Sequence, residues 1–174
     1  MEKELLQTIK TRRSCRRYKS EQIPDELLRQ VLEAGTYAPT ARGLQSPFIV
    51  AVQEPDQLRQ LTEMNARIMG VSTNPYYDAP TYVLVFAPAG GKNSLQDGSC
   101  VLENMMLAAH ALGLGSCWIN REQEMFATEE GKALMQRWGL PDGLMGVGAL
   151  ALGYPAATPS EAKPRKADYY RIIR

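Results

Sequence analysis

Apolar residues recur along the chain with two different spacings, which predicts helices alternating with strands. A recurrence every three or four positions is typical of an amphipathic helix, whereas a short continuous apolar run is typical of a buried strand. The predicted helices cover residues 2–10, 24–32, 58–64, 94–112 and 128–139. The predicted strands cover residues 48–52, 81–86, 116–119 and 144–152. This order predicts an α+β or α/β chain with a central sheet.

The predicted helix at 94–112 differs from the others because it is apolar on nearly all sides. A helix of this kind must be covered from several directions. One interpretation is that a partner subunit supplies part of the cover. The other is a central core helix wrapped by its own sheet, and the pattern alone leaves both open.

The length, apolar content and charge of the chain limit the classes of function that it can have. The 174 residues fit a single domain over 1–174, and 44% of them are apolar. The net charge of +1 gives no support to binding of nucleic acid or of a membrane surface. No apolar run reaches membrane-spanning length, and the charged start lacks the apolar region of a signal peptide, so we expect a cytoplasmic protein.

Cysteine and histidine usage limits the chemistry further. The three cysteines, Cys15, Cys100 and Cys117, are far apart in sequence and fit reduced thiols better than disulfides. His110 is the only histidine, so a histidine-rich metal site is excluded and we expect no metal. We expect His110 to be structural and Cys117 to serve packing.

Four segments carry candidate chemistry. Residues 11–19 concentrate arginines and hydroxyl groups that suit a phosphate, and residues 163–166 add a second basic set. The turn-forming segment 38–48 could present donors and acceptors to a polar ring. Two glycines at 113 and 115 would let backbone approach a ligand. Taken singly, each has a plainer interpretation as a solvated turn, a connection, a helix end or a soluble terminus.

A fifth segment, Gly146-Val147-Gly148-Ala149-Leu150-Ala151, matches a dinucleotide-binding fingerprint on paper. That fingerprint needs a strand before it and a helix after it. Here the glycines lie inside a predicted strand that ends in a turn, so we reject a Rossmann site.

The order of the segments is more specific than any one of them. Arg-Arg-Ser-x-Arg-x-Tyr follows the first helix, and Ala-Pro-Thr-Ala-x-x-x-Gln and Tyr-x-Ala-Pro each precede a strand. Ala-Ala-His-Ala-Leu-Gly-Leu-Gly-Ser-Cys-Trp-Ile comes late in the chain, before a closing Pro-Arg-Lys. Together they resemble the short members of the nitroreductase family of FMN flavoproteins. The resemblance covers about residues 5–168.

The resemblance implies a nitroreductase-like α+β fold around a central mixed sheet, and a homodimer with FMN at the subunit interface. Arg12, Arg13 and Ser14 would hold the FMN phosphate, with Arg165 and Lys166 from the tail. Arg16 and Gln45 would lie at the flavin pyrimidine edge. Pro39 and Thr40 would reach the cofactor from the neighbouring chain, and Gly115 and Ser116 would bring backbone against the ring. An asparagine contact is also expected, for which Asn74 is a candidate.

The implied activity is hydride transfer from NADH or NADPH, through flavin N5, to a small organic acceptor such as a nitroaromatic, quinone, enone or flavin. The cycle would be ping-pong, and no side chain would act as a catalytic nucleophile or base. Alternatives are a specialised member such as a reductive dehalogenase, and a flavin carrier or sensor without turnover. The expected rim of the acceptor pocket comprises Met64, Met69, Tyr76, Tyr77 and Phe126.

Overall fold

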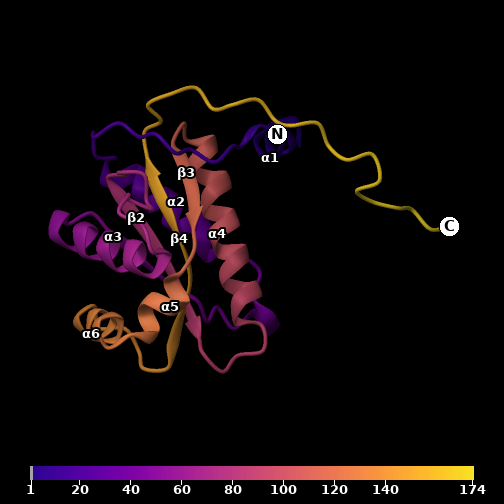
Figure 1. Cartoon of the computed structure of the whole chain (residues 1–174). Coiled ribbons are helices and arrows are strands. Elements are labelled where there is room, and N and C mark those ends of the chain that lie inside the picture. The colour runs from indigo at the N-terminus through magenta and orange to yellow at the C-terminus, as the bar shows by residue number, and fades with distance from the viewer. Residues whose placement is uncertain (1) are drawn as a thin grey trace.

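The computed structural model describes residues 2–174, in which a four-stranded sheet lies between two layers of helices (Figure 1). The strands lie in the order β1-β2-β4-β3, and each neighbouring pair is antiparallel. Their bounds are β1 (Phe48–Val52), β2 (Thr81–Pro88), β3 (Gly115–Ile119) and β4 (Leu144–Gly153).

The predicted α+β class and the helix-flanked sheet are confirmed. The sheet was expected to mix parallel and antiparallel strands, but its neighbouring strands are all antiparallel. Across the described residues, parallel pairing occurs only at one isolated bridge, between Ser14 and Ser116. The apolar pattern did not reveal this, because a strand buried on both faces reads as a continuous apolar run whatever the direction of its neighbours.

Among residues 2–174, six helices surround the sheet, and five of them were predicted. The exception is the short α5, whose six residues offer little periodicity. The bounds are α1 (Glu2–Thr11), α2 (Asp25–Thr36), α3 (Pro55–Met69), α4 (Ser94–Ala111), α5 (Glu122–Ala127) and α6 (Glu129–Arg137). A 3-10 turn at Ala41–Gly43 precedes β1.

The central strand β2 divides the core into two halves. Tyr82, Leu84 and Phe86 point to one face, where α3, α5 and α6 pack. Val83 and Val85 point to the other, where α2 and α4 pack (Figure 1). Successive side chains of a strand alternate between faces, so burial on both sides explains why β2 is apolar throughout.

The glycines of the rejected fingerprint serve the packing of β4. A side chain on Gly146 would place its Cβ 2.4 Å from the Glu122 carbonyl oxygen, and one on Gly148 would come within 2.8 Å of the Trp118 indole nitrogen. Both glycines lie inside the strand, where no phosphate-binding turn exists. Rejection of a Rossmann site is therefore confirmed.

Two apolar surfaces are left uncovered by the chain's own fold. Leu5, Leu6 and Ile9 form the apolar stripe of α1, yet each is 49–60% exposed. A hollow of about 450 Å³ lies between α1, α2 and α4, with Leu107 and Ala108 in its wall. The opposite side of α4 packs on the sheet. Within residues 2–174, no helix combines the length and apolarity that crossing a bilayer requires.

Candidate functional site

The basic loop, residues 12–19, is held against one end of the sheet. The Cys15 amide donates to the Ser116 carbonyl oxygen at 2.8 Å, beside the bridge between Ser14 and Ser116. The Lys19 amide donates to the Tyr154 carbonyl oxygen at 2.9 Å, where β4 has ended. The fold therefore brings two of the predicted clusters, Arg12–Ser14 and Gly115–Ser116, side by side.

Arg12 has the chemistry of an anion ligand. Its side chain is half-buried, and its Nη1 atom is buried without a hydrogen-bond partner. A buried guanidinium N–H that lacks an acceptor is costly, so such an atom calls for an explanation such as an absent ion or ligand. A phosphate oxygen would satisfy it with a charge-assisted hydrogen bond. The residues present thus fit an anionic group at this loop.

The other arginines predicted to bind the cofactor point to different partners within the chain. The Arg13 guanidinium donates to the Lys10 carbonyl oxygen at the end of α1. Arg16 is exposed, and its guanidinium lies over the ring of Tyr77, 5.9 Å from the ring centre. Cations from one short segment therefore face in more than one direction, and Arg12 is the one with an unpaired buried donor.

His110 joins the end of α4 to the end of α1, next to the basic loop. Its Nε2 lies 2.8 Å from the Thr11 hydroxyl. Burial, followed by the charges of Arg12 and Arg13, lowers the pKa of His110 below its ordinary value of 6.5. The ring is therefore neutral at pH 7 and adds no charge to the site, which agrees with the structural role predicted for it.

Cys15 and Cys117 fill the space beneath the loop. Both are buried. Desolvation raises the pKa of Cys117, although the Arg16 charge opposes the shift, so the thiol stays protonated and the predicted packing role is supported. A Cβ on Gly115 would lie 2.7 Å from the Cys15 Sγ. Gly115 is thus required by contact with this chain's own cysteine, a reason for the glycine that the sequence did not reveal.

The third predicted cluster lies at the opposite end of α4. The Ala41 amide donates to the Asp97 carboxylate at 3.0 Å, in the first turn of that helix. Asp97 and His110 are thirteen residues apart, or about 20 Å along a helix axis. Pro39, Thr40 and Gln45 therefore do not meet the basic loop within one chain. Thr40 and Gln45 line a separate hollow of about 380 Å³.

The tail residues Arg165 and Lys166 are exposed and lie in a segment without helix or strand. The tail starts beside the basic loop, where the Ala156 amide donates to the Arg17 carbonyl oxygen at 2.9 Å. It then runs away from the body of the molecule (Figure 1). The Arg165 guanidinium donates to the Lys163 carbonyl oxygen, so the structure does not join it to Arg12.

Three of the five residues expected at the rim of an acceptor pocket are buried in the single chain. Met64, Tyr76 and Phe126 are at most 3% exposed and belong to the core between the sheet and α3, α5 and α6. Only Met69 and Tyr77 reach the surface. Asn74, the candidate for a flavin contact, supports its own turn, because its Oδ1 accepts from the Tyr76 amide at 2.8 Å.

A buried polar network went unpredicted. The Glu122 side chain is fully buried, and its Oε1 accepts from the Tyr76 hydroxyl at 2.9 Å while Oε2 has no partner. Asn65 donates to the Asn120 carbonyl oxygen and accepts from Arg121. Desolvation raises the pKa of Glu122 to about 8. In the sequence Glu122 stands among polar residues, which is typical of an exposed turn, so no pattern marked it as buried.

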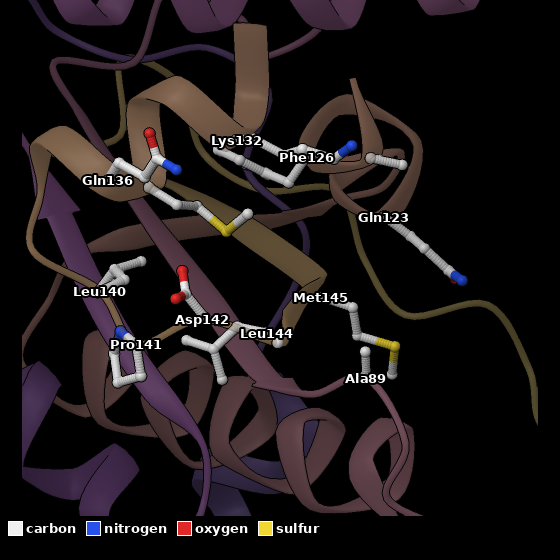
Figure 2. A pocket seen from close by; sticks show the side chains of 13 residues that line it. Ala89, Gln123, Phe126, Lys132, Gln136, Leu140, Pro141, Asp142, Leu144 and Met145 are labelled. Carbon is white, nitrogen blue, oxygen red and sulfur yellow. The ribbon is translucent and has the colours of Figure 1, made fainter. Parts of the chain in front are cut away.

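A further cavity of about 460 Å³ lies near the start of β4 and under α6 (Figure 2). Phe126 and Met145 contribute apolar wall, and Figure 2 shows the Asp142 carboxylate within it. The basic loop meets the other end of β4, so none of the residues predicted to bind the cofactor lines this cavity; of the residues expected at the acceptor-pocket rim, Phe126 does. Among the described residues, no group of three or more His, Cys, Asp or Glu is placed to hold a metal ion.

Comparison with known proteins places this geometry in a family. The profile of the Nitroreductase family matches residues 9–76 and 69–154. A nitroreductase from Bacteroides fragilis, solved with bound FMN, is 35% identical and has a TM-score of 0.88, with 98% of this chain and 99% of that chain covered. An FMN-bound nitroreductase from Desulfitobacterium hafniense is 25% identical, with a TM-score of 0.85 and 98% of each chain covered.

A curated relative points the same way. The protein named FMN reductase (NADPH) from Bacillus subtilis is 25% identical over 185 residues, which cover 92% of this chain and 69% of the relative. The family profile spans most of the chain, and its two matched segments contain the basic loop, the loop before β1 and the start of β3. The chain belongs to the nitroreductase family.

Proposed function

We propose that the chain is an FMN-dependent NAD(P)H oxidoreductase. The single observation that carries the proposal is the unpaired, buried Nη1 of Arg12 beside the Ser14–Ser116 bridge, in a chain whose relatives include FMN-bound nitroreductases. FMN, when bound, would take hydride from a nicotinamide at N5 and deliver it to a small organic acceptor. The two substrates would use one place in turn, in a ping-pong cycle.

The chain's own residues would bind and orient the cofactor. Arg12, Arg13 and Ser14 would hold the phosphate, with Arg165 and Lys166 as added cations. Arg16 would stand at the pyrimidine edge, where a cation favours the reduced, anionic ring. Gly115 and Ser116 would present backbone to the ring. No catalytic nucleophile or base is assigned to a side chain.

A second copy of the chain would complete the site. Ala41 contacts Asp97 at the start of α4, whereas Thr11 contacts His110 near its end, about 20 Å away along the helix axis. This separation supports a site in which Pro39, Thr40 and Gln45 come from a different chain than the basic loop. The uncovered apolar stripe of α1 supports a homodimer as well. We also propose that residues 1–174 form one domain, and a cytoplasmic location stays a prediction.

The test starts with purified protein and FMN. We expect a yellow complex that loses its colour when NADH or NADPH is added without oxygen. Arg12→Glu should weaken FMN binding by more than about tenfold, because a charged hydrogen bond contributes about 1.5–3 kcal/mol. Arg29→Glu, on the exposed face of α2, is the matched control and should bind FMN normally. Protein that cannot take up FMN would refute the proposal.

Turnover separates the remaining alternatives. Steady-state oxidation of NAD(P)H, followed with a nitroaromatic, a quinone, an enone, free flavin and a halogenated aromatic, gives the order of acceptors. A flavin carrier or sensor would bind FMN and show no turnover with any of them. A specialised reductive dehalogenase would prefer the halogenated substrate.

A further inference from the structure

The turn before β2 has an unusual backbone. Tyr77 and Asp78 are consecutive residues with φ of 58° and 54°, in the left-handed region that side chains with a Cβ rarely adopt. Asn74 holds the turn, since its Oδ1 accepts from the Tyr76 amide and its Nδ2 donates to the Asp78 carboxylate, both at 2.8 Å. Backbone outliers fixed by surrounding contacts concentrate at functional sites.

This turn sends two adjacent tyrosines into different environments. Tyr76 is fully buried, its ring stacks on Tyr82 with centroids 3.9 Å apart, and its hydroxyl donates to Glu122. Tyr77 is half-buried and lies at the surface, under the Arg16 guanidinium. The buried contacts of Tyr76 therefore determine where the ring of Tyr77 stands.

Tyr77 also restricts Arg16. Arg16 lies in a surface loop, and its long side chain has many rotamers in water. A guanidinium within about 6 Å of an aromatic ring centre is attracted to the ring face. Interaction with the Tyr77 side chain is the largest cause that raises the pKa of Arg16, in keeping with the contact between the guanidinium and the ring. The ring thus supplies a surface on which the guanidinium rests.

We propose that Tyr77 is a positioning residue, which holds the Arg16 guanidinium at the place where the flavin would present its pyrimidine edge. This inference rests on the proposed function, because it assigns Arg16 to that edge. Tyr77 acts through Arg16 and favours the reduced flavin over the oxidised one. A freely rotating arginine would carry the same charge but would stand at the flavin edge for less of the time.

The experiment is a double-mutant cycle on the FMN-loaded protein. The variants are Tyr77→Leu, Tyr77→Phe, Arg16→Met and the double variant Tyr77→Leu/Arg16→Met. For each, the dissociation constant of oxidised FMN and the two-electron midpoint potential of the bound flavin are measured. Circular dichroism and thermal unfolding establish that each variant is folded. If the leucine variant does not fold, Tyr77→Met takes its place in the same cycle.

The expected result is an effect of Tyr77 on the flavin that depends on the presence of Arg16. Tyr77→Leu weakens binding of oxidised FMN about two- to fivefold, as loss of an exposed cation–π contact implies. It weakens binding of reduced FMN about fivefold more, so the midpoint potential falls by about 20 mV, from 29.6 mV per tenfold for two electrons. Tyr77→Phe keeps the ring and stays near wild type. In the Arg16→Met background, Tyr77→Leu changes neither quantity.

Other outcomes overturn the inference in distinguishable ways. If Arg16→Met lowers the potential but Tyr77→Leu does not, Arg16 is correctly placed and Tyr77 has no positioning role. If Tyr77→Leu lowers the potential equally in both backgrounds, Tyr77 acts on the flavin without Arg16. If Arg16→Met itself has no effect, the assignment of Arg16 within the proposed function fails, and the role of Tyr77 fails with it.

Discussion

Glu122 illustrates how one buried carboxyl can couple folding to pH. Its side chain is buried beside Tyr76, and the neighbouring cation Arg121 directs its Nε to Asn65 instead. Desolvation, the largest cause, raises its pKa from 4.5 to about 8. A protonated carboxyl avoids most of the cost of burying a charge without a counter-ion.

The expected consequence is a stability that declines with pH. Between about pH 4.5 and 8 the folded chain keeps the Glu122 proton and the unfolded chain loses it, so the free energy of unfolding falls as pH rises. The decline is about 1.4 kcal/mol per pH unit at its steepest and levels off above pH 8. Urea unfolding at several pH values measures it.

Two matched variants distinguish the contribution of Glu122 to this pH dependence from the contributions of other carboxyl groups. Glu122→Gln keeps an acceptor for Tyr76 and removes the titration, so its free energy of unfolding should vary much less between pH 5 and 8. Glu103→Gln, on an exposed position of α4, should decline like wild type. Equal slopes in wild type and Glu122→Gln would show that Glu122 is ionised in the folded chain at neutral pH.

At the scale of elements, the sequence predicted best those segments whose apolar pattern stops where the helix or strand itself ends. β1 occupies residues 48–52 as predicted, because a five-residue apolar run is followed directly by the polar residues Gln53 and Glu54. The short α5 was missed, since six residues make fewer than two turns. The turn at Tyr77 and Asp78 was also beyond prediction, because its left-handed backbone carries no glycine.

The start of α6 gives an element-scale prediction. The Thr128 hydroxyl accepts from the Gly131 amide at 3.1 Å and donates to the Met125 carbonyl oxygen at 2.6 Å, so it caps α6 and ties it to α5. Thr128→Ala should lower the free energy of unfolding by about 1 kcal/mol, the usual cost of losing such a cap. Urea denaturation measures the change. Thr128→Ser keeps the hydroxyl and should lose much less; equal losses would argue against capping.

At the scale of the whole molecule, the sequence predicted the functional segments well but predicted the contacts between them less well. The resemblance joined the basic loop to Gly115 and Ser116, and the fold places them side by side. Side-chain contacts over long sequence separations, such as Tyr76 with Glu122, have no local pattern and were not predicted. The apolar stripe of α1 was read correctly as helical, but a single sequence does not say which surface covers it.

A homodimer is the remaining whole-molecule prediction, and α1 provides its test. Leu5 and Ile9 are 60% and 49% exposed, although their spacing places both on one apolar face. In a two-fold symmetric interface each side chain is buried twice. Burying one such side chain contributes about 1.5–3 kcal/mol, so Leu5→Asp/Ile9→Asp should raise the dimer dissociation constant by at least about a thousandfold.

Sedimentation of the double variant across a concentration series measures this constant. Ile68→Asp, a change at a 38% exposed position on α3, is the control and should stay dimeric. Because the basic loop and the loop before β1 lie at opposite ends of α4, a monomer would hold only half of the contacts proposed for FMN. The monomeric variant should therefore also lose FMN. A monomer that binds FMN as tightly as wild type would mean that the cofactor site is complete within one chain.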